Sequence, residues 1–125
     1  MNSSQNYTFM YEEEDIKKNK FFAVISYLPL LFLIPLIFRK KSKFARFHAN
    51  QGLSLFVTEL IVSAIYLILK WVFTFFALTG LFIALNFVMA VVFIVILSLI
   101  LVGVMNANGN LAKSLPFIGG IEILK

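Results

Sequence analysis

The chain has 125 residues, enough for one domain; 61% of them are hydrophobic and only 14% are charged. A soluble domain is typically about 45–50% apolar and about 25% charged, so this composition predicts a protein that is solvated by lipid. The net charge is +5 and there is no cysteine, which excludes disulfides, thiolate metal sites and cysteine nucleophiles. Because the cations adjoin apolar runs, we expect them to meet anionic lipid and not nucleic acid.

The N-terminal part combines a polar stretch with an apolar run. Residues 1–20 are polar and carry an acidic run followed by lysines, which predicts a mobile tail. Residues 21–38 carry no charge and are long enough to cross about 30 Å of hydrocarbon. Pro29 and Pro35 each lack a backbone donor, so we predict a kinked first transmembrane span.

Two further apolar runs follow a basic loop at residues 39–46. The second predicted span covers residues 47–69 and ends at Lys70 and Trp71, a cation and an aromatic ring typical of a membrane–water boundary. The third covers residues 81–105 and ends at the sequence NANGN, where a helix terminates readily. The predicted fold is all-α: a single membrane domain over residues 21–125, with three transmembrane helices and a short interfacial C-terminal segment.

Charge bias sets the predicted orientation. Three spans place the two termini on opposite sides of the cytoplasmic membrane, and the side with more Lys and Arg faces the cytoplasm. The loop and C-terminal side has seven, against four on the other: Arg39, Lys40, Lys41, Lys43, Arg46, Lys113 and Lys125 against Lys17, Lys18, Lys20 and Lys70. We therefore expect a cytoplasmic C-terminus and an N-terminus outside.

Glu59 is the one acid inside a predicted span. Counting 1.5 Å per residue from Phe47 places it about 18 Å along the helix, close to the midplane. A carboxylate there costs about 2.5–3.5 kcal/mol, so it is protonated, paired or beside water. One interpretation is a proton- or cation-binding group. The other, which we favour, is a neutral acid that holds helices together by a hydrogen bond to Ser63 or Asn86.

A second group of residues lies where the basic loop enters the second span: Phe44, Arg46, His48, Gln51 and Gly52. His48 is the only histidine. We interpret it as a headgroup-level side chain that faces lipid phosphate or a helix end, because no acidic or cysteine neighbours form a metal site with it. The His–Gln pair remains the best candidate for a more specific role.

Two further sets of residues are candidates for binding. Asn50, Ser54 and Thr58 recur every fourth residue on one helix face and, with Asn86, predict a helix-packing stripe for a homo-oligomer or a larger membrane complex. The alternative for this face is a hydrated groove. The cluster of Arg39, Lys40, Lys41 and Lys43 predicts contact with lipid phosphate, a topology signal, or both. No nucleophile–base pair or metal cluster is present, so the sequence predicts no enzyme and no cofactor.

These motifs together resemble the Tic-twenty-like superfamily, the bacterial and archaeal relatives of a chloroplast import component, over residues 23–121. The resemblance depends on the proline-containing first span, the basic loop and seven positions: Phe44, His48, Gln51, Gly52, Gly109, Pro116 and Gly119. It implies a small helical membrane protein without established enzymatic activity. Plastid relatives are similar to channel or scaffold subunits with four spans, whereas three are predicted here.

Three functional hypotheses remain open from the sequence. The favoured one is a structural or accessory membrane module that docks to a larger complex. The second is a subunit of a small transporter or channel in which Glu59 handles protons or cations. The third, which depends on analogy alone, is a bacteriocin-immunity or peptide-export accessory protein.

Overall fold

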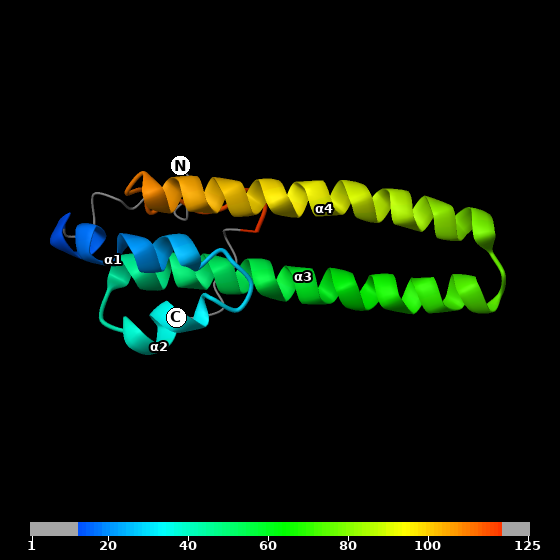
Figure 1. Cartoon of the computed structure of the whole chain (residues 1–125), viewed down its shortest axis with the longest axis horizontal. Coiled ribbons are helices and arrows are strands. Elements are labelled where there is room, and N and C mark those ends of the chain that lie inside the picture. Colours follow the sequence, from blue (N-terminus) through cyan, green and yellow to red (C-terminus); the bar gives the residue numbers. More distant parts are fainter. Residues whose placement is uncertain (1–12, 119–125) are drawn as a thin grey trace.

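The computed structural model describes residues 13–118, which form the helices α1 (Glu13–Ile25), α2 (Leu33–Phe38), α3 (Lys43–Phe75) and α4 (Thr79–Asn108). Figure 1 shows α3 and α4 lying side by side and antiparallel, with α1 and α2 packed against one end of the pair. Leu55 is the last buried residue of α3 and Leu99 the first of α4. We call residues 56–98 the hairpin, and residues 13–55 and 99–118 the cap.

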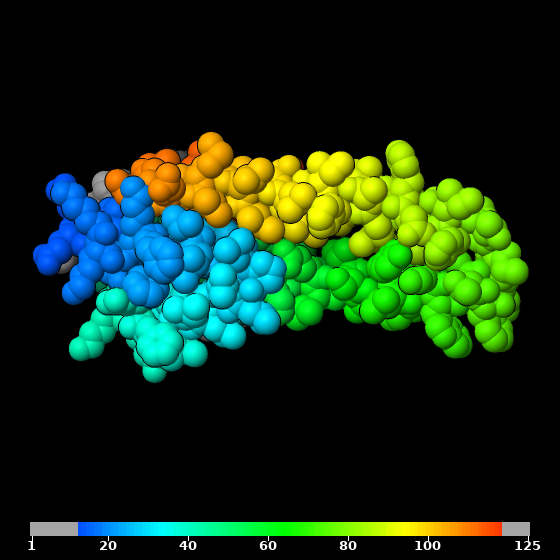
Figure 2. Space-filling view, viewed as in Figure 1, coloured from blue at the N-terminus to red at the C-terminus, as the bar shows by residue number. Residues whose placement is uncertain are grey.

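The hairpin exposes apolar side chains along its whole length. Figure 2 shows it as a narrow pair of helices extending from the broader cap. Ile65, Phe87 and Ile94 are each more than half exposed, and many neighbours are similar. Two helices in the described part, α3 and α4, are long and apolar enough to cross a membrane. The all-α prediction is confirmed for the described residues, but the prediction of three spans is not.

The predicted first span, residues 21–38, is a helical segment that turns back on itself. Asp15 contacts Ser42 at the start of α3, while Tyr27 contacts His48 and Phe32 contacts Phe56 further along it. The chain therefore descends beside α3 and returns through α2 to the basic residues at 39–43.

The local sequence explains this turn. Pro29 has no backbone N–H to continue α1, and Leu30 adopts the left-handed conformation with φ of 67°. Pro35, in contrast, is tolerated inside α2, where it is buried. An apolar run of sufficient length thus does not form one long helix, because its middle is a turn and not a kink.

Other boundaries also differ from the sequence prediction. Residues 13–20, predicted as part of a mobile tail, belong to α1, because Ile16, Asn19 and Ala23 are buried along one face of that helix. Residues 1–12 lie outside the described part. Both long helices extend beyond their predicted limits, and α3 includes the end of the predicted basic loop. The predicted stop at NANGN is confirmed, since Gly109 caps α4.

The segment after α4 packs back onto the cap. Asn110 has φ of 64°, which reverses the chain, and Ala112 and Leu115 are buried. The predicted C-terminal segment therefore contributes to the core of the cap as far as residue 118. Residues 119–125, including Gly119 of the predicted motif, lie outside the described part.

Two glycines allow the close packing of the cap. A Cβ at Gly52 would overlap the backbone carbonyl of Ser26, and a Cβ at Gly103 would overlap the ring of Tyr27. Small residues let helices approach in this way in membranes. The end of α1 is thereby fixed between α3 and α4.

Candidate functional site

His48 lies at the centre of the cap. Its side chain is 0% exposed, its Nδ1 is 2.5 Å from the hydroxyl of Tyr27, and its Nε2 is 3.0 Å from the carbonyl oxygen of Leu111. A carbonyl oxygen only accepts, so Nε2 carries the proton and donates. Nδ1 then accepts from the Tyr27 hydroxyl, and the imidazole is held neutral in one tautomer.

Aromatic rings enclose the same imidazole. The rings of Tyr27, Phe44 and Phe47 meet it edge-on, with centroids 5.5, 4.8 and 5.2 Å away. Of the two predicted neighbours of His48, lipid phosphate is wrong, because the residue is 0% exposed. Its partners Tyr27 and Leu111 lie just beyond the ends of α1 and α4, close to the predicted alternative of a helix end. The sequence could not reveal these partners, since they come from segments 21 and 63 positions away.

Gln51 follows His48 by three residues in α3 and, like His48, binds the C-terminal segment. Its Oε1 accepts a hydrogen bond of 2.9 Å from the backbone N–H of Leu115. Together His48 and Gln51 satisfy two backbone groups of that segment, and Gly52 fits against Ser26 on the other side. The residues of the predicted motif therefore lie together inside the cap and hold its segments in place. Phe44 is 0% exposed, and Arg46 is only partly exposed.

Asp15 is a site residue that the sequence analysis missed. Its Oδ1 accepts from Ser42 Oγ at 2.5 Å, and its Oδ2 accepts from the backbone N–H of Phe44 at 3.2 Å. Ser42 is the N-cap of α3 and accepts from the backbone N–H of Ala45. A carboxylate at a helix N-terminus satisfies unpaired N–H groups and interacts favourably with the helix dipole. A serine directly before Lys43 was the available signal of this helix start.

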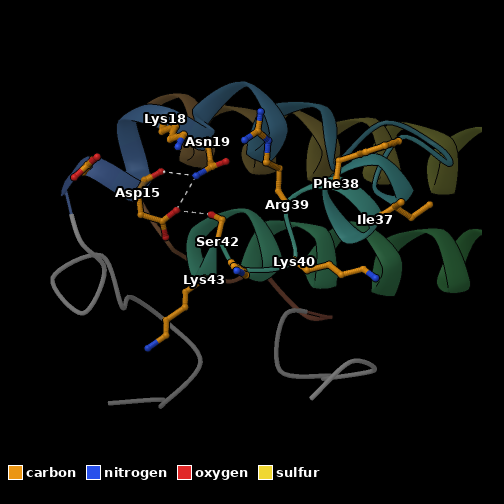
Figure 3. A pocket seen from close by; sticks show the side chains of 11 residues that line it. Asp15, Lys18, Asn19, Ile37, Phe38, Arg39, Lys40, Ser42 and Lys43 are labelled. Carbon is orange, nitrogen blue, oxygen red and sulfur yellow. Dashed lines mark hydrogen bonds between the residues drawn. The ribbon is translucent and has the colours of Figure 1, made fainter.

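The predicted basic cluster lines a cavity. Arg39, Lys40, Lys41 and Lys43 all border a hollow of about 740 Å³, together with residues of the first turns of α1. Figure 3 shows Asp15, Asn19 and Ser42 joined by hydrogen bonds at one side of it. The structure therefore brings four predicted residues to one place.

Glu59 and the predicted stripe are not gathered in one place. Glu59 is partly exposed on the hairpin, and no hydrogen bond or ion pair to it is found within residues 13–118. Ser54 is buried in the cap, and Thr58 bonds to the carbonyl of Ser54 in its own helix. Asn50 is half-buried near the same level.

Asn86 joins the two helices of the hairpin. It accepts a hydrogen bond of 3.1 Å from the hydroxyl of Tyr66, and its amide donates to the carbonyl of Phe82. The partner of Asn86 is therefore Tyr66, whereas the sequence suggested Glu59. Whether Asn50, Ser54, Thr58 and Asn86 pack against a second chain stays a prediction.

No cluster of three or more His, Asp or Glu side chains that could hold a metal ion occurs among the described residues. The polar groups that the cap brings together are hydrogen-bonded pairs and a group of cations. The fold and this site define a small helical membrane protein whose cap is stabilised by buried hydrogen bonds.

More particularly, the chain belongs to the MamF/MmsF family, described as the magnetosome magnetite crystal formation protein family, which it matches over residues 18–123. The match covers the hairpin and all of the cap except residues 13–17. No match was found among the curated proteins or the solved structures.

The family match corrects the resemblance to the Tic-twenty-like superfamily, which is wrong. That resemblance depended on short motifs between apolar runs. In the structure these positions form the interior of the cap: Phe44 and Gly52 pack there. His48 and Gln51 bind backbone groups of the C-terminal segment.

Proposed function

We propose that this chain is an accessory, non-enzymatic protein of the magnetosome membrane that acts in magnetite crystal formation. The match over residues 18–123 carries the proposal. The two long apolar helices support its membrane setting. The role is that of a membrane-embedded scaffold that supports the process without performing chemistry on iron itself.

The positions of charged residues support a particular depth in the bilayer. Lys43 begins α3, and Lys70 lies near its other end. At 1.5 Å per residue they are about 40 Å apart, close to the total thickness of a bilayer with its headgroups. Trp71 adjoins Lys70, as expected at an interface. Both long helices then cross, and the segment from α1 to α2 enters one leaflet and returns.

The same charges support an orientation. Of the described Lys and Arg residues, Lys70 alone lies in the hairpin and the others lie in the cap. Segments rich in Lys and Arg next to membrane spans stay on the cytoplasmic side. The cap therefore faces the cytoplasm, and the turn between α3 and α4 faces the opposite side. Both ends of the described chain are then on the cytoplasmic side, which replaces the N-terminus-outside arrangement expected from three spans.

This orientation bears on contact with iron. Residues 60–108, which include the whole turn, contain no Asp or Glu. Hard iron cations bind carboxylates and other oxygen ligands, so the turn is poorly equipped to coordinate them. An accessory action through the membrane fits these residues better than direct nucleation of a mineral.

The test is complementation in a magnetosome-forming bacterium that lacks its own family member. We expect this chain to restore crystal size and number, measured by electron microscopy. Val91→Lys places a charge in the middle of α4 and should abolish rescue, because a central lysine costs about 2.5–3.5 kcal/mol on insertion. Lys113→Gln is the control and should rescue fully. Unchanged crystals despite magnetosome-membrane localisation of the wild-type chain would overturn the proposal.

The transporter hypothesis gains no support from contacts of Glu59 in the described part of the chain. The described part of one copy offers two long helices, too few to enclose a pore by themselves. The bacteriocin-immunity hypothesis likewise has no contact or cavity in its favour. We therefore keep the accessory role as the one proposed function.

A further inference from the structure

We propose that the cavity between α1 and the α2–α3 link binds the phosphate headgroup of an anionic phospholipid. The cavity has a volume of about 740 Å³, sufficient for a headgroup. Its wall carries five cationic side chains and two acidic ones: Lys18, Arg39, Lys40, Lys41 and Lys43 against Glu14 and Asp15. The excess of positive charge favours an anion and opposes a metal cation.

Arg39 provides the first specific donor. Its guanidinium lies over the ring of Phe22, 4.4 Å from the centroid, which fixes the side chain against α1. Its Nε is buried and has no hydrogen-bond partner. The carboxylate of Asp15 is engaged by Ser42, Asn19 and the start of α3. A guanidinium that is held in place and has an unpaired Nε–H suits a phosphate oxygen.

Asn19 provides the matching acceptor. Its side chain is 5% exposed and lines the same cavity, and its Nδ2 donates to Asp15. Its Oδ1 has no partner, although buried polar atoms are nearly always paired. A carbonyl oxygen from a residue that lines the same cavity as Arg39 can accept from a hydroxyl on the headgroup. Phosphatidylglycerol supplies both the phosphate and the hydroxyls.

The rim of the cavity argues for a lipid and against free phosphate. Ile37 and Phe38 border it and are 57% and 71% exposed. They immediately precede Arg39, so an apolar surface adjoins the donor, as an acyl chain next to its headgroup requires. The site depends on the proposed membrane placement, which puts the start of α3 at headgroup level.

Native mass spectrometry of the full chain in detergent tests the site, with phosphatidylglycerol and phosphatidylcholine as probes. We expect phosphatidylglycerol to bind at least fivefold more tightly than phosphatidylcholine. Arg39→Gln should reduce that binding at least fivefold, and Arg39→Lys should also reduce it because Nε and the planar fork are lost. Lys70→Gln removes the same charge at the far end of α3 and should leave binding unchanged.

Three outcomes would overturn the proposal. Equal loss in Arg39→Gln and Lys70→Gln would mean general charge attraction. Unchanged binding in Arg39→Lys would mean that charge alone suffices. Tight binding of inorganic phosphate that displaces phosphatidylglycerol would mean a site for the free anion. If the chain still inserts into vesicles, any of these results refutes the lipid site. The proposed function is then unaffected.

Discussion

The hydroxyl of Tyr27 donates to Nδ1 of His48 across 2.5 Å, and both side chains are almost fully buried. This contact joins the end of α1 to the first part of α3. Because the other nitrogen of His48 donates to Leu111, one imidazole connects three segments that are distant in sequence. The cap therefore depends on two linked hydrogen bonds inside an otherwise apolar protein.

Removing the Tyr27 hydroxyl should destabilise the cap. Tyr27→Phe leaves Nδ1 of His48 as a buried acceptor without a donor, which costs about 1–3 kcal/mol. Tyr66→Phe is the control, since it removes the hydroxyl that bonds Asn86 in the exposed hairpin. Unfolding in detergent, followed by circular dichroism, should show a clearly larger loss for Tyr27→Phe. Equal losses would contradict the role assigned to the buried contact.

Glycine substitutions should separate packing from helix propensity. Alanine normally stabilises a helix relative to glycine by about 1 kcal/mol. Gly52→Ala should nevertheless destabilise the protein, because its Cβ would overlap the rigid carbonyl of Ser26. Gly80→Ala, in the first turn of α4 with nothing within 4 Å, should be neutral or stabilising. The same unfolding measurement ranks the two, and a neutral Gly52→Ala would show that α1 does not pack this closely.

Asp15 should matter far more than its acidic neighbours. Asp15→Asn removes the charge that accepts from Ser42 and from the start of α3, a loss of about 1–3 kcal/mol. Glu13→Gln breaks only an exposed ion pair with Lys17, worth about 0–1 kcal/mol. A double-mutant cycle of Asp15→Asn with Ser42→Ala should give a coupling energy well above zero. Additive effects would mean that the two side chains act independently.

Composition and hydropathy predicted the membrane class and the two long helices because these follow from chemistry that is local in sequence. The stop of α4 at Gly109 was also visible, since helix termination is a local property. The turn at Pro29 was not, because proline in a long apolar run is compatible with a kink as well as with a reversal. The contacts of Tyr27 and Phe32 with α3 and the left-handed conformation of Leu30 distinguish the two.

The candidate site was predictable in part for the same reason. The sequence singled out His48, Gln51 and the cation cluster, since polar residues between apolar runs are conspicuous. Their partners are backbone groups at Leu111 and Leu115, which carry no signature in the side-chain pattern. Asp15 was assigned to a solvated acidic run, although its hydrogen bonds reach residues 27 and 29 positions away.

Topology gives the sharpest test, because the natural chain has no cysteine to remove. Single variants Lys18→Cys, Lys41→Cys and Lys113→Cys place a thiol in the cap, and Leu78→Cys places one in the turn between α3 and α4. With two crossings, a membrane-impermeant maleimide should label the three cap positions from the cytoplasmic side and position 78 from the opposite side. Three crossings would place position 18 on the opposite side from position 41. The decisive comparison is therefore between positions 18 and 41, which flank the segment that turns back.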